Sequence, residues 1–292
     1  MKKRVFFKLF LPNSMKKLFL PIIIAIIFTS CRDKKTDFVP QQNPFDVFPT
    51  HFQKKVLLEN FVSETDENTI QNNQLINQLV YKYQSNLIVS NIHKQDWLET
   101  PYTNDIATML GGLQSYGRAA VNRLVGENTV QHDDNFTLLQ TVNWDYTIQR
   151  ALNDTAKIAL AIETQVDKKN IGSVQLHIAH KEAIEKDLRI GIYMIENNIQ
   201  SLFQLGGDAN FLHQHVMKSS LFDILGDTIL LDTEYADGEI KTKTYQNIDL
   251  KLFHVNNLYL VAFIYNYDID FRKMKIYNAI EVKMGGVKFW NQ

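Results

Sequence analysis

The feature that most constrains the fold is an alternation of short apolar runs with helical segments between residues 55 and 124. Residues 55–61 and 86–92 are apolar runs of strand length, and the apolar residues between them recur at a helical spacing. We expect a second helix over residues 103–113 and a third strand over residues 119–124. Strand–helix–strand units need crossover connections, so the sequence predicts a parallel or mixed sheet covered by helices.

Beyond residue 143 the pattern changes to strands without intervening helices. Residues 144–152 form an amphipathic pattern that we interpret as a helix linking two halves of the chain. The strands expected after it are residues 157–166, 173–180, 188–196, 224–235, 242–254, 258–268 and 277–284. Asp237-Gly238 and Asn256-Asn257 are hairpin-turn signals between them. Seven short strands of this kind favour an all-β, immunoglobulin-like sandwich over residues 144–292, after an α/β domain over residues 54–143.

The first thirty residues have the features of a secretory signal. They contain six basic and no acidic residues, and an apolar run covers residues 18–28. This run is shorter than the roughly 20 residues that a spanning helix needs, and its flanks suit a signal peptide. Because the stretch from Met15 is already a complete signal, translation starts at either Met1 or Met15.

Cys31 is the single cysteine of the chain and follows this signal directly. One cysteine excludes an intrachain disulfide, a CxxC redox pair and a cysteine-based zinc site. The sequence Phe28-Thr29-Ser30-Cys31 resembles a bacterial lipobox, which implies cleavage before Cys31 and lipid attachment to its sulfur. The alternative is an ordinary buried cysteine. We expect residues 31–53 to be a lipidated tether whose phenylalanines partly dock on the body. We also expect an outer-membrane location, because Arg32 does not resemble an aspartate-based inner-membrane retention signal.

Removal of the signal changes the charge balance. The remaining chain holds 25 basic and 32 acidic residues, a net charge of −7. An acidic body argues against nucleic acid as a partner and against electrostatic binding to anionic lipid. We therefore expect the N-terminal lipid to hold the protein at the membrane.

Several segments, in a shared order, resemble the Omp28-type outer membrane lipoproteins of Bacteroidetes. The segments are Val56-Leu57-Leu58-Glu59-Asn60-Phe61, Asn91-Ile92-His93, Ala120-Val121-Asn122-Arg123, Phe211-Leu212-His213-Gln214-His215-Val216-Met217-Lys218 and the closing residues 258–265 and 279–282. The resemblance covers most of residues 52–284. It implies a thioredoxin-like domain followed by a β-sandwich, with no established reaction.

The chain departs from this family at the positions that would carry thiol chemistry. Many members have a pair of cysteines after the first strand, and the corresponding positions are Asp66 and Thr69. A proline often precedes the third strand, and Gly117 lies nearest to that position. Neither Asp66 nor Thr69 can form a thiolate, so the resemblance implies a redox-dead scaffold that lacks thiol–disulfide oxidoreductase activity.

Polar clusters offer weaker candidates for chemistry. Glu64, Asp66 and Glu67 could bind a cation or act as paired carboxylates, but acidic residues also favour a helix N-terminus. His213 and His215 lie on one side of an extended segment and could be metal ligands, although no third ligand is identifiable beyond the distant His177 and His180. We expect no cofactor and no metal.

Trp97, Tyr102 and Tyr116 could line a peptide- or glycan-binding face, and ordinary packing is the alternative. The leading hypothesis is a non-enzymatic interaction module whose partner is an envelope protein, a peptide or a glycan. The alternatives are a metal-assisted hydrolase that uses the acidic loop or the His213/His215 segment, and a purely structural outer-membrane lipoprotein.

Overall fold

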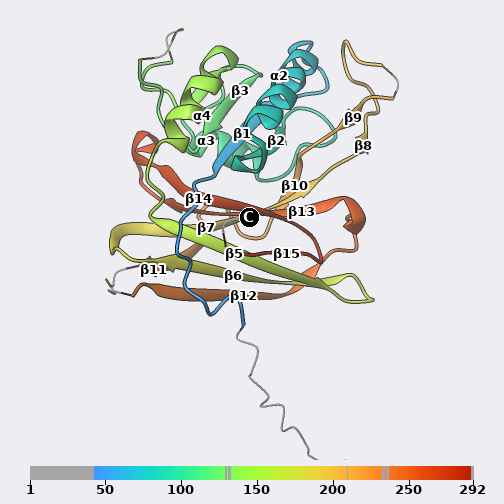
Figure 1. Cartoon of the computed structure of the whole chain (residues 1–292). Helices are drawn as coiled ribbons and strands as arrows, with labels where there is room; N and C mark the ends of the chain where they lie inside the picture. The colour runs from blue at the N-terminus through green and yellow to red at the C-terminus, as the bar shows by residue number, and fades with distance from the viewer. Residues whose placement is uncertain are drawn as a thin grey trace, which may run out of the picture. The chain divides into compact units, whose positions relative to one another are not determined.

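The computed structural model describes residues 43–128, 130, 133–208, 210–231, 234 and 237–290 (Figure 1). Cys31 and the expected signal peptide lie outside these residues. Within the described ranges, no helix combines the length and the apolar character needed to cross a membrane.

The first half of the described chain has the expected alternation of strands and helices. Its elements are β1 (Val56–Val62), α2 (Asn68–Tyr83), β2 (Leu87–His93), α3 (Thr103–Met109), β3 (Arg118–Val121), β4 (Leu138–Gln140) and α4 (Trp144–Leu152), with 3₁₀ turns at Gln84–Asn86 and Thr141–Asn143. β2 is parallel to β1, β3 is antiparallel to β1, and β4 is antiparallel to β3. The predicted mixed sheet is confirmed, and this order is that of a thioredoxin-like unit.

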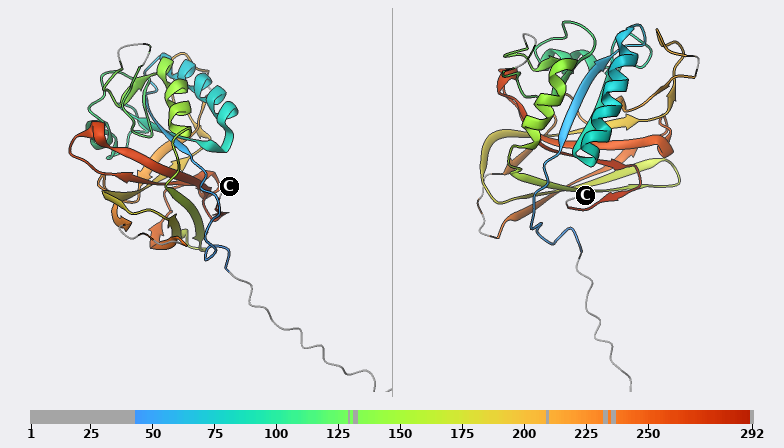
Figure 2. Two further views of the ribbon diagram at one scale, coloured as in Figure 1. Left: turned by 60° about the vertical axis from the view of Figure 1, so that its left-hand side comes forward. Right: turned by 45° about the horizontal axis from the view of Figure 1, so that its top comes forward.

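The helices α2 and α4 cover one face of this sheet (Figure 2). Ile76 and Leu79 of α2, with Trp144 and Ile148 of α4, are buried in one apolar core with the strands. The indole nitrogen of Trp144 also donates a hydrogen bond of 3.0 Å to the carbonyl oxygen of Leu139. α4 is therefore the last helix of the thioredoxin-like unit and not the linker that the sequence suggested, because its apolar face packs on β1 and β3.

The second half consists of strands. They are β5 (Ile158–Val166), β6 (Ile171–His180), β7 (Ile184–Glu196), β8 (Ile199–Gln200), β9 (Leu212–His213), β10 (Val216–Ser220), β11 (Asp227–Leu231), β12 (Glu239–Asp249), β13 (Leu258–Asn266), β14 (Lys275–Lys283) and β15 (Val287–Lys288), with 3₁₀ turns at Val255–Asn257 and Phe271–Lys273. A sheet of order β12-β6-β5-β15 packs face to face with β7, β13 and β14, and buried side chains such as Ile178 and Ile192 fill the space between them. The seven expected strands are all present, and the immunoglobulin-like connectivity stays a prediction.

The two halves share one sheet, so the expected pair of separate domains is not what the structure has. Its strand order is β14-β13-β7-β10-β2-β1-β3-β4, and the halves meet where Val216 of β10 pairs with Asn91 of β2. β13 and β7 are apolar on both faces, as sheets covered on both sides are. One face packs on β5 and β6, and the other packs on α3 and the thioredoxin-like strands through residues such as Phe263 and Ile106.

The described part of the tether lies against β6. The ring of Phe45 stacks on His177 at 4.3 Å between centroids and on Phe289 at 5.2 Å. Phe48 packs beside Phe52, with the ammonium of Lys181 5.4 Å from the Phe48 ring. The expected docking through aromatic side chains is confirmed here. The tether therefore enters the body on the side away from the β8–β9 hairpin (Figures 1 and 2).

Candidate functional site

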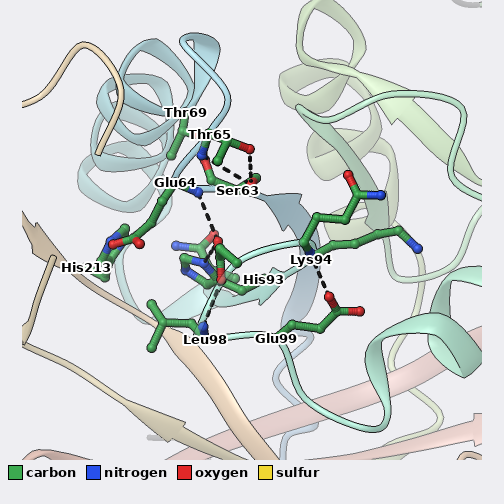
Figure 3. Close-up of polar contacts among 12 residues, drawn as sticks. Ser63, Glu64, Thr65, Thr69, His93, Lys94, Leu98, Glu99 and His213 are labelled. Carbon is green, nitrogen blue, oxygen red and sulfur yellow. Dashed lines mark hydrogen bonds and ion pairs between the residues drawn. The ribbon is translucent and has the colours of Figure 1, made fainter. Parts of the chain in front are cut away.

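The candidate site lies where β1 and β2 end and the loop before α2 begins. Because β1 and β2 are parallel, their carboxyl ends meet at one edge, and crevices at such edges are the usual ligand sites of open α/β sheets. Glu64, which follows β1, and His93, at the end of β2, lie close together there (Figure 3). Asp96, which follows β2, forms hydrogen bonds with both residues.

Glu64 is the centre of the site. Its Oε1 atom accepts a hydrogen bond of 2.6 Å from the hydroxyl of Ser201 and lies 2.9 Å from Nε2 of His213. Glu64 and His213 are only 4% and 2% exposed. Burial lowers the pKa of His213 below its usual value, and this effect outweighs the opposing effect of the hydrogen bond to Glu64. We therefore describe His213 as a neutral imidazole that donates from Nε2 to the Glu64 carboxylate.

A second histidine–carboxylate pair lies beside the first. Nδ1 of His93 is 2.7 Å from Oδ2 of Asp96, and the same oxygen accepts a hydrogen bond of 2.9 Å from the backbone N–H of Glu64. Burial alone would raise the pKa of Asp96, but the hydrogen bonds from His93 and from two backbone N–H groups lower it overall. The His93 and His213 rings meet edge to face at 4.9 Å, so the two pairs form one buried polar network.

The β8–β9 hairpin closes this network from outside. The backbone N–H of Leu205 donates to the carbonyl oxygen of Glu64 at 2.8 Å, and the amide of Gln204 donates to the same oxygen at 3.3 Å. Ser201 and His213 add the two side-chain contacts to the Glu64 carboxylate. A segment far along the chain thus binds the loop at which a thioredoxin would present its thiols.

The three positions that the family resemblance aligns with thiol chemistry lie around this loop. Oδ1 of Asp66 accepts a hydrogen bond of 3.2 Å from the backbone N–H of Asn68, and the hydroxyl of Thr69 donates to the carbonyl oxygen of Ser63 at 2.8 Å. Gly117 has a φ of +71°, and a Cβ atom there would lie 2.5 Å from the Asn72 amide nitrogen. All three positions therefore serve the local backbone: two fasten the turn, and the third needs the absence of a side chain.

The acidic cluster and the histidine pair do not converge on a metal. Glu64 is engaged as described, and Glu67 is an exposed residue at the start of α2 without a capping hydrogen bond. His215 has its own surroundings: its carbonyl oxygen accepts from the backbone N–H of Asn91 at 2.7 Å, and burial lowers its pKa to about 4. Among the described residues, no group of three or more metal-ligating side chains is placed to hold an ion.

His177 and His180 lie in another part of the body. Nδ1 of His177 is 2.9 Å from the Thr242 hydroxyl, and Nε2 of His180 is 3.0 Å from a carboxylate oxygen of Glu239. Both histidines belong to β6, so they are not ligands to a site at the end of β1.

The three aromatic candidates have separate environments. Trp97 is 47% exposed, with the ammonium of Lys218 5.7 Å from its ring. The Tyr116 hydroxyl donates to the side-chain oxygen of Gln95 at 2.6 Å, whereas Tyr102 packs against the core beside α3. Trp97 and Tyr116 therefore flank the loop after β2, while Tyr102 has a packing role.

Sequence reasoning missed Ser201 and Asp96 and did not connect Glu64 with His213. The position of Asp96, three residues after His93, was a local signal for the second pair. The Glu64–His213 contact spans 149 positions and has no local signal.

Comparisons with known proteins agree with this architecture. The family model of the outer membrane protein Omp28 matches residues 112–285, which is more than half of the chain. The chain belongs to the Omp28 family. A search of curated proteins found no match.

Solved structures extend the fold comparison to the first half of the chain. HBP35 of Porphyromonas gingivalis is similar over 80% of this chain and 76% of that chain, with 19% identity and a TM-score of 0.67. The protein AGR_C_4864 from Agrobacterium tumefaciens is similar over 80% of this chain and 96% of that chain, with 9% identity and a TM-score of 0.51. At these identities the likeness concerns the fold alone. Membership of the Omp28 family places the protein at the outer membrane.

Proposed function

We propose that this Omp28-family chain is a lipid-anchored envelope protein that acts as a non-enzymatic interaction module on a thioredoxin-like scaffold. The observation that carries the proposal is the closure of the former active-site loop by the β8–β9 hairpin through Glu64. A thiol enzyme must expose its reactive sulfur at this loop, whereas here the loop has no cysteine and its polar atoms bond to the hairpin.

The burial of the histidine–carboxylate network supports a role without catalysis. Glu64, His93 and His213 are each less than 5% exposed, and each has a polar partner within the network. A general acid or base must come within hydrogen-bond reach of a substrate, and the hairpin occupies the space through which a substrate would approach.

The hairpin itself supplies the interaction surface. Leu202 and Phe203, two and three residues after the end of β8, are 77% and 64% exposed, and Leu212 of β9 is 47% exposed. Neighbouring exposed apolar side chains on a short loop are typical of protein-binding sites. We expect these side chains to meet an envelope protein or an extended peptide.

Affinity purification from solubilised envelopes tests the proposal. We expect one or more partners to be recovered with the native chain and lost with Leu202→Asp combined with Phe203→Asp. Leu252→Asp is the matched control, because Leu252 is 94% exposed and follows β12 in the other sheet. Insulin reduction by the purified protein, or equal recovery from the native and the double-variant chain, would refute the proposal.

The lipid anchor has its own test. Mass spectrometry of the mature N-terminus should find Cys31 as the first residue with acyl chains attached. Each buried methylene of such a chain contributes about 0.8 kcal/mol to membrane binding, so two or three chains anchor stably. An unmodified Cys31 still joined to Ser30 would contradict the anchor.

A further inference from the structure

A second candidate site lies between α3 and the C-terminal sheet, away from the β8–β9 hairpin. It is built around Arg123, which is 1% exposed and has a left-handed backbone conformation with φ of +56°. Nε and Nη2 of Arg123 each donate a hydrogen bond of 2.9 Å to the carboxylate of Glu59, which is fully buried. The hydroxyl of Tyr193 donates to the same carboxylate at 2.8 Å.

One nitrogen of the Arg123 guanidinium makes no hydrogen bond. Nη1 of Arg123 is buried and has no hydrogen-bond partner. Because Nε and Nη2 occupy the edge of the planar group that faces Glu59, Nη1 lies on the other edge. A buried donor without an acceptor costs about 1–3 kcal/mol, and more when it is charged, so the position favours any group that supplies an acceptor.

Arg123 lines a small cavity that leads outward. The cavity has a volume of about 10 Å³, which is room for one oxygen-sized group, and its walls include Phe263 and Tyr265. It shares two wall residues, Met109 and Ile224, with a groove of about 300 Å³. The cavity and the groove therefore lie next to each other, and Arg123 lines the cavity.

The walls of the groove are mostly apolar and include two carboxylates. Its apolar walls come from Met109, Ile224, Tyr267, Phe271 and Met274. The carboxylates of Asp105 and Asp268 also line it, and Asp105 is exposed. The walls suit an aliphatic or aromatic chain, while the carboxylates disfavour a ligand with negative charge.

The charge at the inner end selects the polar group of the ligand. Glu59 already neutralises Arg123, so Nη1 offers a hydrogen bond without a surplus positive charge. A neutral acceptor satisfies it, whereas a carboxylate would bring an unpaired negative charge next to Glu59. We propose that this site binds a small neutral amphiphile, with its apolar chain in the groove and an amide or carbonyl oxygen on Nη1 of Arg123.

Hexanamide is the probe for this site, observed through ¹³C-methyl spectra of the methionines. The three apolar cores are formed by residues between 56 and 284, so the unlipidated chain expressed from Arg32 retains them. We expect saturable shifts of the Met109 and Met274 methyl signals at millimolar probe, with Met109→Leu and Met274→Leu used for assignment. Hexylammonium has no acceptor and hexanoate is an anion, so each should bind about tenfold more weakly.

Ile224→Trp fills the groove without contact to Glu59 and should abolish the shifts. Leu252→Trp, on an exposed loop, is the control and should leave them unchanged. Arg123 itself is left unchanged in these variants, because Arg123→Gln would also break the ion pair with Glu59. The proposal is overturned if hexanamide gives no saturable shift, if hexylammonium or hexanoate binds as well as hexanamide, or if Ile224→Trp retains the response.

Discussion

Acidification should weaken the seam between the two halves of the shared sheet through His215. Its carbonyl oxygen accepts from the backbone N–H of Asn91 on β2, and its Nδ1 atom is buried without a hydrogen-bond partner. Burial lowers the pKa of His215 from 6.5 to about 4. The unfolded chain therefore takes up a proton near pH 6.5, whereas the folded chain takes it up only near pH 4, so stability falls as the pH falls through this window.

The magnitude follows from the two pKa values. Each pKa unit of difference between the folded and the unfolded chain corresponds to about 1.4 kcal/mol. Relative to pH 8, the titration of His215 should therefore lower the free energy of unfolding by about 2 kcal/mol at pH 5 and by about 3 kcal/mol at pH 4. His215→Asn removes this titration, and asparagine tolerates the left-handed φ of +57° at position 215.

Urea unfolding between pH 8 and pH 4 measures the effect. Other groups titrate equally in both proteins, so the difference between the native and the His215→Asn curves isolates His215. We expect this difference to grow by about 3 kcal/mol toward pH 4. Parallel curves would refute the reasoning, because they would mean that His215 is solvated or paired in the folded state.

Three further predictions concern the buried polar groups and the loop. Glu59→Gln should lower the free energy of unfolding by about 3–5 kcal/mol, because it leaves the Arg123 charge buried and unpaired. Urea unfolding should show that replacing both Glu59 and Arg123 by Met recovers much of this loss. An equal loss in both variants would contradict the prediction. Gly117→Ala should lower the free energy of unfolding by about 1–3 kcal/mol more than Gly112→Ala does. Both glycines have a positive φ, but of the two only Gly117 has a side-chain atom within 3 Å of the added Cβ. Equal melting temperatures of the two variants would count against this prediction. Glu64→Ala should weaken the packing of the β8–β9 hairpin on the body by about 2–3 kcal/mol, because it removes the hydrogen bonds to Ser201 and His213. Amide hydrogen exchange should become faster at residues 199–213 and stay unchanged in β13. Uniform acceleration in both segments would argue against a local role of Glu64.

The sequence predicted those elements that are long and whose apolar pattern is regular. The helix α4 and the strands β5 and β13 fall within the expected ranges, and α2 lies between the first two predicted strands, because each has enough residues for a helical or strand-like pattern to be visible. β7 begins four residues before the expected range of 188–196. β8, β9 and β15 have two residues each, so tertiary contacts define them and no pattern exists to detect.

The union of the two halves could not be predicted from local patterns. It rests on the β10–β2 pairing at Val216 and Asn91, and such pairing depends on long-range geometry. The apolar character of β13 on both faces was a partial signal for a second covering layer. The sequence named Glu64 and His213 as separate candidates but did not bring them together, and the roles of Asp66, Thr69 and Gly117 follow only from the family resemblance. The closure of the site by Ser201 and His213 was not predictable, because those residues lie in a separate half of the sequence.

The proposed interaction surface consists of Leu202, Phe203 and Leu212 on the β8–β9 hairpin. Photocrosslinking in intact cells tests it most directly, with a photoreactive amino acid at Phe203 and, as control, at Leu252, both of which are well exposed. We expect discrete covalent adducts from position 203, abolished by Leu202→Asp, and none from position 252. The same adducts from both positions, or none from position 203, would contradict it.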